Sequence, residues 1–113
     1  MSYKGKTQFE VCQELNWHLS EYGDGSGTIE NDKYGYMVYY DTLDGSDFYL
    51  DVLEAYNKFD VNQYVYDTLR AYGVMDVEKL LGNAREIRGE LKQLADAVKQ
   101  WMEDNGIEEK PKA

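Results

Sequence analysis

Residues 77–104 have the sequence VEKLLGNAREIRGELKQLADAVKQWMED, the longest regular pattern in the chain. Apolar side chains recur there at alternating steps of four and three residues, the heptad spacing of a helix with one apolar seam. The seam residues are Leu80, Ala84, Ile87, Leu91, Leu94, Val98 and Trp101. Asp76 stands directly before the stretch and is a suitable N-cap. The sequence therefore predicts one long helix, residues 77–104.

The seam permits two interpretations. Either it packs on the other elements of its own domain, or part of it mediates a homodimer. A helix of 28 residues is about 40 Å long at 1.5 Å per residue, which is longer than a small sheet covers. In the second interpretation the end around Val98, Trp101 and Met102 contacts a partner.

Two further helices are expected before the long one. Thr7 is followed three residues later by Glu10, the pattern of a capping box. Apolar residues at steps of three and four then extend the first helix to about Tyr22. Asp60 is the expected N-cap of the second helix, residues 61–72, which Gly73 ends.

The residues between these helices favour strands. Three short segments, 28–30, 34–41 and 48–53, have the composition or alternation of strands, and turn residues separate them. Residues 54–59 fit either the end of a strand or a helical turn. The sequence thus predicts an α+β fold: an N-terminal helix, a three-stranded antiparallel β-meander and two C-terminal helices, the last one long. We expect a single domain over residues 1–106, followed by a charged flexible tail, residues 107–113.

The chain is strongly acidic. Its 113 residues carry a formal net charge of −10. Between Glu21 and Glu54 there are nine acids and one base, Lys33. A field of this sign repels nucleic acid and anionic membranes and attracts basic partners. We therefore expect no direct contact with nucleic acid or membrane.

Common kinds of reactive site are missing from the sequence. The single cysteine, Cys12, excludes a disulfide framework, and the single histidine, His18, excludes sites that need two. Residues 24–30 resemble part of a calcium loop, but Tyr22 and Lys33 fall where oxygen ligands are required. We expect no enzyme activity, no metal and no cofactor. Because the chain has no apolar segment long enough for a membrane span or signal peptide, we expect a cytoplasmic protein.

Eleven tyrosines are present, most of them in the middle of the chain. The strand pattern turns Tyr39 and Tyr49 outward, beside Asp41 and Asp51. Exposed tyrosine beside aspartate is suited to protein recognition. The alternative is that tyrosine is frequent here because it favours strands.

The chain has two resemblances to known families. The order helix–strand–strand–strand–helix is similar to the double-stranded RNA-binding domain, but the regions that would meet RNA, residues 60–63 or 76–79, are mostly acidic or neutral. Residues 59–97, which include Phe59-Asp60-Val61-Asn62 and Ala84-Arg85-Glu86-Ile87, resemble small acidic proteins of plasmids and phages, of the antirestriction and anti-CRISPR type. That resemblance implies an inhibitor without catalytic residues that acts in a bacterial host cell, and in several such proteins carboxylates imitate DNA phosphates.

These observations predict a non-enzymatic inhibitor of a CRISPR nuclease or a restriction enzyme. Its carboxylates would occupy the basic nucleic-acid-binding groove of the nuclease or of its guide complex. The expected contact residues are Glu30, Asp32, Tyr39, Asp41, Asp44, Asp47, Tyr49, Asp51 and Glu54. The alternative is a protein–protein adapter or accessory protein that acts through the long heptad helix.

Overall fold

The computed structural model of the chain describes residues 2–44, 46–73 and 76–109. Along these residues lie α1 (Gln8–Glu14), β1 (Trp17–Glu21), β2 (Gly27–Asn31), β3 (Met37–Tyr40), α2 (Asp47–Lys58), α3 (Val61–Tyr72) and α4 (Val77–Asp104). The predicted α+β class is confirmed, with an N-terminal helix, an antiparallel sheet of three strands and a long final helix. Three helices follow the sheet in the described residues, one more than predicted.

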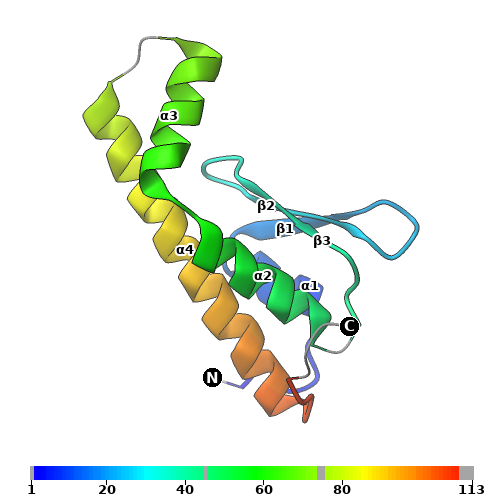
Figure 1. Cartoon of the computed structure of the whole chain (residues 1–113). Coiled ribbons are helices and arrows are strands. Elements are labelled where there is room, and N and C mark those ends of the chain that lie inside the picture. Colours follow the sequence, from blue (N-terminus) through cyan, green and yellow to red (C-terminus); the bar gives the residue numbers. More distant parts are fainter. Residues whose placement is uncertain (1, 45, 74–75, 110–113) are drawn as a thin grey trace.

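The other helices all pack on α4 (Figure 1). α1, α2 and α3 each contact it, and every residue of the predicted heptad seam is buried. The part of the seam from Ile87 onward joins the main core with the sheet, whereas Leu80 and Ala84 form a smaller cluster with Val65 of α3. The seam therefore packs inside its own chain. Its C-terminal end, including Trp101, leaves little apolar surface for a homodimer.

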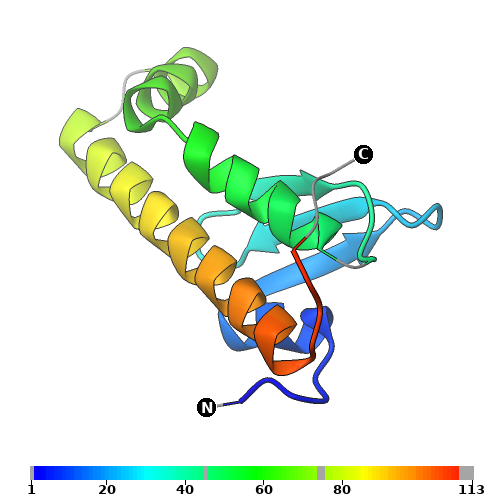
Figure 2. The same ribbon diagram turned by 60° about the horizontal axis from the view of Figure 1, so that its bottom comes forward.

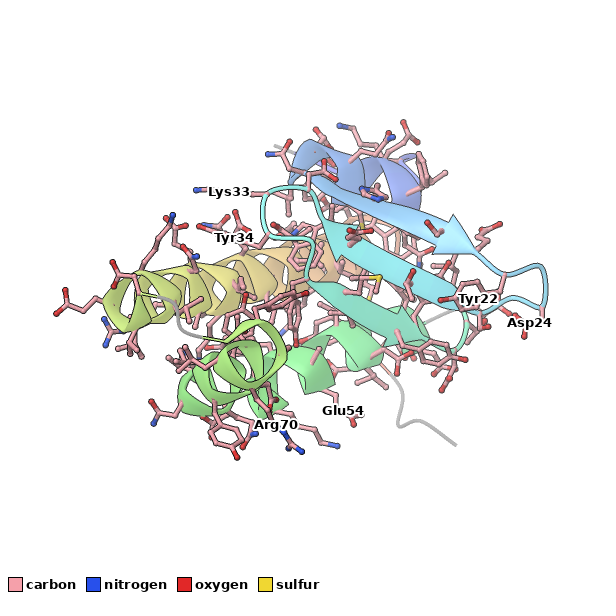
Figure 3. The ribbon with its side chains drawn as sticks, turned by 90° about the horizontal axis from the view of Figure 1, so that it is seen from above. Tyr22, Asp24, Lys33, Tyr34, Glu54 and Arg70 are labelled. Atoms are coloured by element: carbon pink, nitrogen blue, oxygen red, sulfur yellow. The ribbon has the colours of Figure 1, made fainter. Side chains whose placement is uncertain are left out.

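The sheet has one covered face and one open face. Its strands follow the order β1-β2-β3, and both neighbouring pairs are antiparallel. Because side chains alternate along a strand, Ile29, Val38 and Tyr40 point into the core. Figure 2 shows α2 and α4 in front of this covered face. The opposite face, toward the viewer in Figure 3, has no described helix over it.

The prediction that the first helix continues to about Tyr22 is wrong. α1 ends at Glu14, and Asn16 has a φ of 64°, a left-handed conformation that does not continue a helix. The following residues pair with β2 as strand β1. Trp17 and Leu19 turn inward and their neighbours outward, a period of two that the helical spacing of the surrounding apolar residues concealed.

The prediction of a strand over residues 48–53 is also wrong, because this segment forms α2. β1 supplies the third strand of the sheet instead, and Phe48, Tyr49 and Val52 are buried along one side of a helix. A short apolar-rich segment fits both periods, so its sequence did not decide between them. The undecided residues 54–59 are helical as far as position 58.

The starts of the three helices that the sequence predicted are confirmed. Thr7 and Glu10 form the expected capping box. The carboxylate of Asp60 accepts a hydrogen bond from the Gln63 N–H, and that of Asp76 accepts one from the Lys79 N–H. Caps are local interactions between residues close in sequence, which is why the sequence reveals them.

A buried asparagine fixes the turn between β2 and β3. The side-chain oxygen of Asn31 accepts hydrogen bonds from the N–H groups of Lys33 (3.0 Å) and Tyr34 (2.9 Å). Its amide nitrogen donates to Glu90 of α4 at 2.5 Å. This one side chain therefore holds the turn and joins it to the long helix.

The predicted tail, residues 107–113, lies partly outside the described residues. Within them, the N–H of Ile107 donates to the Met102 carbonyl at 2.8 Å, and the Ile107 side chain packs against the core. No helix in the described part of the chain is long and apolar enough to cross a membrane.

Gly27 and Gly82 make a matched stability test. A Cβ at Gly27 would lie 2.1 Å from the Ser20 carbonyl oxygen and 2.6 Å from the Tyr40 hydroxyl oxygen. We expect Gly27→Ala to lower the free energy of unfolding by about 2 kcal/mol or more. Gly82→Ala meets nothing within 4 Å and should raise it by about 0.5–1 kcal/mol, since alanine favours helix. Urea denaturation measures both, and equal urea midpoints for Gly27→Ala and the unmodified protein would contradict this packing.

Candidate partner-binding surface

A groove lies beside the β3 edge of the sheet, between β3 and α2. Its volume is about 530 Å³. The strand side is lined by Tyr36, Met37, Val38, Tyr39 and Asp41, and the helix side by Asp51, Glu54, Ala55 and Lys58. Figure 3 labels Glu54 on α2, which runs beside this edge of the sheet. Strand and helix together form a depression that is open to solvent.

Four of the predicted contact residues line this groove: Tyr39, Asp41, Asp51 and Glu54. The Asp41 N–H donates to the carboxylate of Asp51 at 2.9 Å, which ties the end of β3 to α2. Glu54 lies three residues further along the helix and forms an ion pair with Lys58 at 2.6 Å. The lining thus contains three carboxylates and one ammonium group.

Exposed apolar side chains accompany these charges. Tyr39 is 57% exposed and Met37 is 59% exposed. Both lie on the open face of the sheet, next to each other in the alternation of β3. Tyr36 is half-buried at the groove, where its ring packs edge-on against Phe59 at 5.4 Å between ring centroids. Burial raises the pKa of Tyr36, so its phenol stays neutral.

Glu30 and Asp32 lie at a different place on the open face, around His18. The register pairs His18 of β1 with Glu30 of β2. The Nε2 of His18 is 3.6 Å from a carboxylate oxygen of Glu30, and its Nδ1 is hydrogen bonded to Asp32. All three side chains are exposed to solvent by 40% or more. Sequence spacing did not reveal this cluster, because the prediction placed His18 on a helix.

Asp44 lies shortly before α2, and Asp47 is the first residue of that helix. Asp44 is exposed, and its carbonyl accepts a hydrogen bond from the Asp47 N–H at 3.2 Å. Asp47 is half-buried in the first turn of the helix, where a negative charge interacts favourably with the helix dipole. Asp47 therefore also contributes to the stability of α2.

The expectation that Tyr49 faces outward is wrong. Tyr49 belongs to α2 rather than to a strand, and only 6% of it is exposed within the main core. A side chain in this position offers a partner almost no surface. The strand prediction caused this error, since it placed Tyr49 on the same face as Asp51.

Tyr36, Met37 and Lys58 also line the groove and were not among the predicted contact residues. A signal for Met37 was present, because it shares a strand face with Tyr39 and Asp41. No comparable signal existed for Lys58, since its place depends on residues 48–58 being helical.

Cys12 is unsuited to nucleophilic chemistry. Its side chain is fully buried, and burial raises the pKa of its thiol to about 12. At neutral pH the thiolate, which is the reactive form, is therefore negligible. The described residues contain no group of three or more histidine, cysteine or acidic side chains arranged to hold a metal ion.

Comparisons with known proteins give no match: no family model, no curated protein and no solved structure matches this chain. A function for the chain therefore has to be inferred from the groove and the residues around it.

Substitutions at Tyr49 and Tyr39 distinguish the buried from the exposed tyrosine. We expect Tyr49→Ala to lower the free energy of unfolding by about 3 kcal/mol, because it removes a buried ring. Tyr39→Thr keeps a strand-favouring residue at an exposed position and should change it by less than about 0.5 kcal/mol. Chemical denaturation measures both values. Similar values for the two variants would contradict the assigned positions.

Proposed function

We propose that this protein is a non-enzymatic inhibitor that binds the basic nucleic-acid-binding groove of a nuclease. The target class is a CRISPR nuclease, alone or with its guide, or a restriction enzyme, in the cytoplasm of a bacterial host. The observation that carries the proposal is the groove between β3 and α2, where carboxylates of α2 and of Asp41, just after β3, lie beside exposed Tyr39 and Met37.

The spacing of acids on α2 supports charge mimicry. Asp47, Asp51 and Glu54 follow each other at steps of four and three residues and so lie on one side of the helix. At 1.5 Å per residue the steps correspond to about 6 and 4.5 Å along the axis. A DNA strand carries one phosphate per about 3.4 Å of axis. The helix thus presents a row of negative charges, about two-thirds as dense along its axis as the phosphates of one DNA strand.

Lysine and arginine side chains are the natural partners of this surface. Carboxylate–arginine pairs are directional and stronger than hydrogen bonds between neutral groups. The net charge of −10 would also speed the approach to a basic groove at low salt. Tyr39 and Met37 add apolar contact area. The likeness of residues 59–97 to antirestriction and anti-CRISPR proteins points to the same class of target.

An adapter role is the second candidate, and one observation favours it. α3 and the start of α4 project from the sheet as a helical hairpin (Figure 1). Tyr66, Tyr72 and Val77 are exposed there by 60%, 78% and 47%. An adapter would use these residues rather than the heptad seam, which is buried. Its binding would depend on apolar contact and would change little with salt.

A DNA cleavage assay tests the inhibitor proposal. The protein is added to a panel of guide-loaded CRISPR nucleases and restriction endonucleases, and the concentration for half inhibition is measured. We expect at least one enzyme to be inhibited, with inhibition relieved by rising salt and by excess duplex DNA. The double variant Asp41→Lys, Glu54→Lys should raise that concentration at least tenfold, because it reverses two groove charges while keeping Asp51.

A matched control distinguishes the effect of the groove charges on inhibition from the effect of net charge. Glu103→Lys, Glu108→Lys changes the net charge by the same amount at exposed positions outside the groove lining. We expect this control to change half inhibition less than threefold. Inhibition of no enzyme, or equal losses in the two double variants, would overturn the proposal.

A further inference from the structure

β3 is an edge strand whose outer side is paired with no other described strand. It pairs with β2 alone, and beyond it lies the groove that separates it from α2. Natural proteins commonly protect such edges with proline, with charged residues or with a bulge. β3 has the sequence Met-Val-Tyr-Tyr and contains neither proline nor charge.

The hydrogen-bond pattern shows which backbone groups of β3 point outward. The Asn31 N–H donates to the Tyr36 carbonyl at 2.9 Å, so these two residues form a hydrogen-bonded pair. Such pairs alternate with non-hydrogen-bonded pairs in an antiparallel ladder. The N–H and C=O groups of Val38 therefore face β2, whereas those of Met37 and Tyr39 face the groove.

The backbone of Asp41 gives independent evidence for this alternation of inward and outward groups. It lies two residues beyond Tyr39, so its backbone should also point away from β2. Its N–H does so and donates to the carboxylate of Asp51 on α2. The edge thus offers the backbone groups of two residues, Met37 and Tyr39. At one end of the edge, the next outward N–H is that of Asp41, which already donates to Asp51.

We propose that the groove binds an extended lysine- or arginine-containing segment of the partner protein as a fourth strand on β3. The inference rests on the proposed function, because it uses the same surface, and it adds the conformation of the recognised segment. Backbone hydrogen bonds would come from Met37 and Tyr39. Side chains of the segment that point toward α2 would meet Asp51 and Glu54.

The lining determines the chemistry of the bound segment. Three carboxylates against one ammonium group disfavour an acidic peptide and favour a basic one. The exposed side chains of Met37 and Tyr39 add apolar contacts for alternate residues on the open face. Strand addition explains both features, since the backbone supplies affinity and the alternating side chains supply specificity.

A peptide library tests the inference directly. The probes are ten-residue peptides with lysine or arginine at alternate positions and valine, isoleucine, threonine or tyrosine between them. Binding to the full chain is measured by fluorescence anisotropy. We expect members of the library to bind, and N-methylation of the amides that face β3 to weaken binding at least tenfold. N-methylation of the other amides should change it less than threefold.

Tyr39 offers a matched pair of protein variants. Tyr39→Pro removes the outward N–H, which the ladder with β2 does not use. Tyr39→Thr removes the same aromatic side chain but keeps the N–H. We expect peptide binding to fall at least tenfold more in the proline variant. Circular dichroism checks that both variants are folded; if the proline variant is not, the N-methylated peptides decide.

The outcomes separate this inference from the proposed function. If no library member binds, or if both N-methylated forms bind equally, strand addition is wrong. The reversal of Asp41 and Glu54 would still test inhibition in the cleavage assay. Conversely, peptide binding that requires the β3-facing amides supports strand addition, even where no nuclease of the panel is inhibited.

Discussion

The burial of the apolar seam of α4 is the constraint on which the other elements depend. The sheet has only three strands and is not stable without a hydrophobic cover on one face. α4 and α2 supply that cover, and α1 and α3 also pack on the long helix. With one face of the sheet and the seam buried in this way, the open face, the β3 edge and the projecting hairpin of α3 and α4 remain accessible to a partner.

The sequence predicted the elements that depend on local signals. α3 and α4 have the expected bounds, since caps at Asp60 and Asp76 and a sustained apolar period specify them together. The segment around Trp17 was predicted as helix and is a strand, and the segment around Phe48 was predicted as strand and is a helix. Each is short, and each satisfies both periods within its few apolar residues. Tertiary pairing decided them: Trp17 pairs with β2, and Phe48 packs under the sheet.

For the candidate surface too, the sequence predicted only the features that depend on local signals. The acidic character of the region and the exposure of Tyr39 were visible in the composition and in strand alternation. The groove itself was not, because it requires α2 to lie beside β3 as a helix. The same error placed Tyr49 outside, whereas it is part of the core. Charge pattern therefore indicated the kind of partner, and only the fold located where strand and helix meet.

Hydrogen exchange at the β3 amides tests the central claim most directly, because it reports the edge with and without an occupant. In the free protein, the amides of Val38 and Tyr40 should exchange slowly and those of Met37 and Tyr39 rapidly. With an inhibited nuclease or a binding library peptide present at saturation, we expect the amides of Met37 and Tyr39 to become protected. Protection confined to α3 and the start of α4, with Met37 and Tyr39 unchanged, would contradict strand addition at this edge.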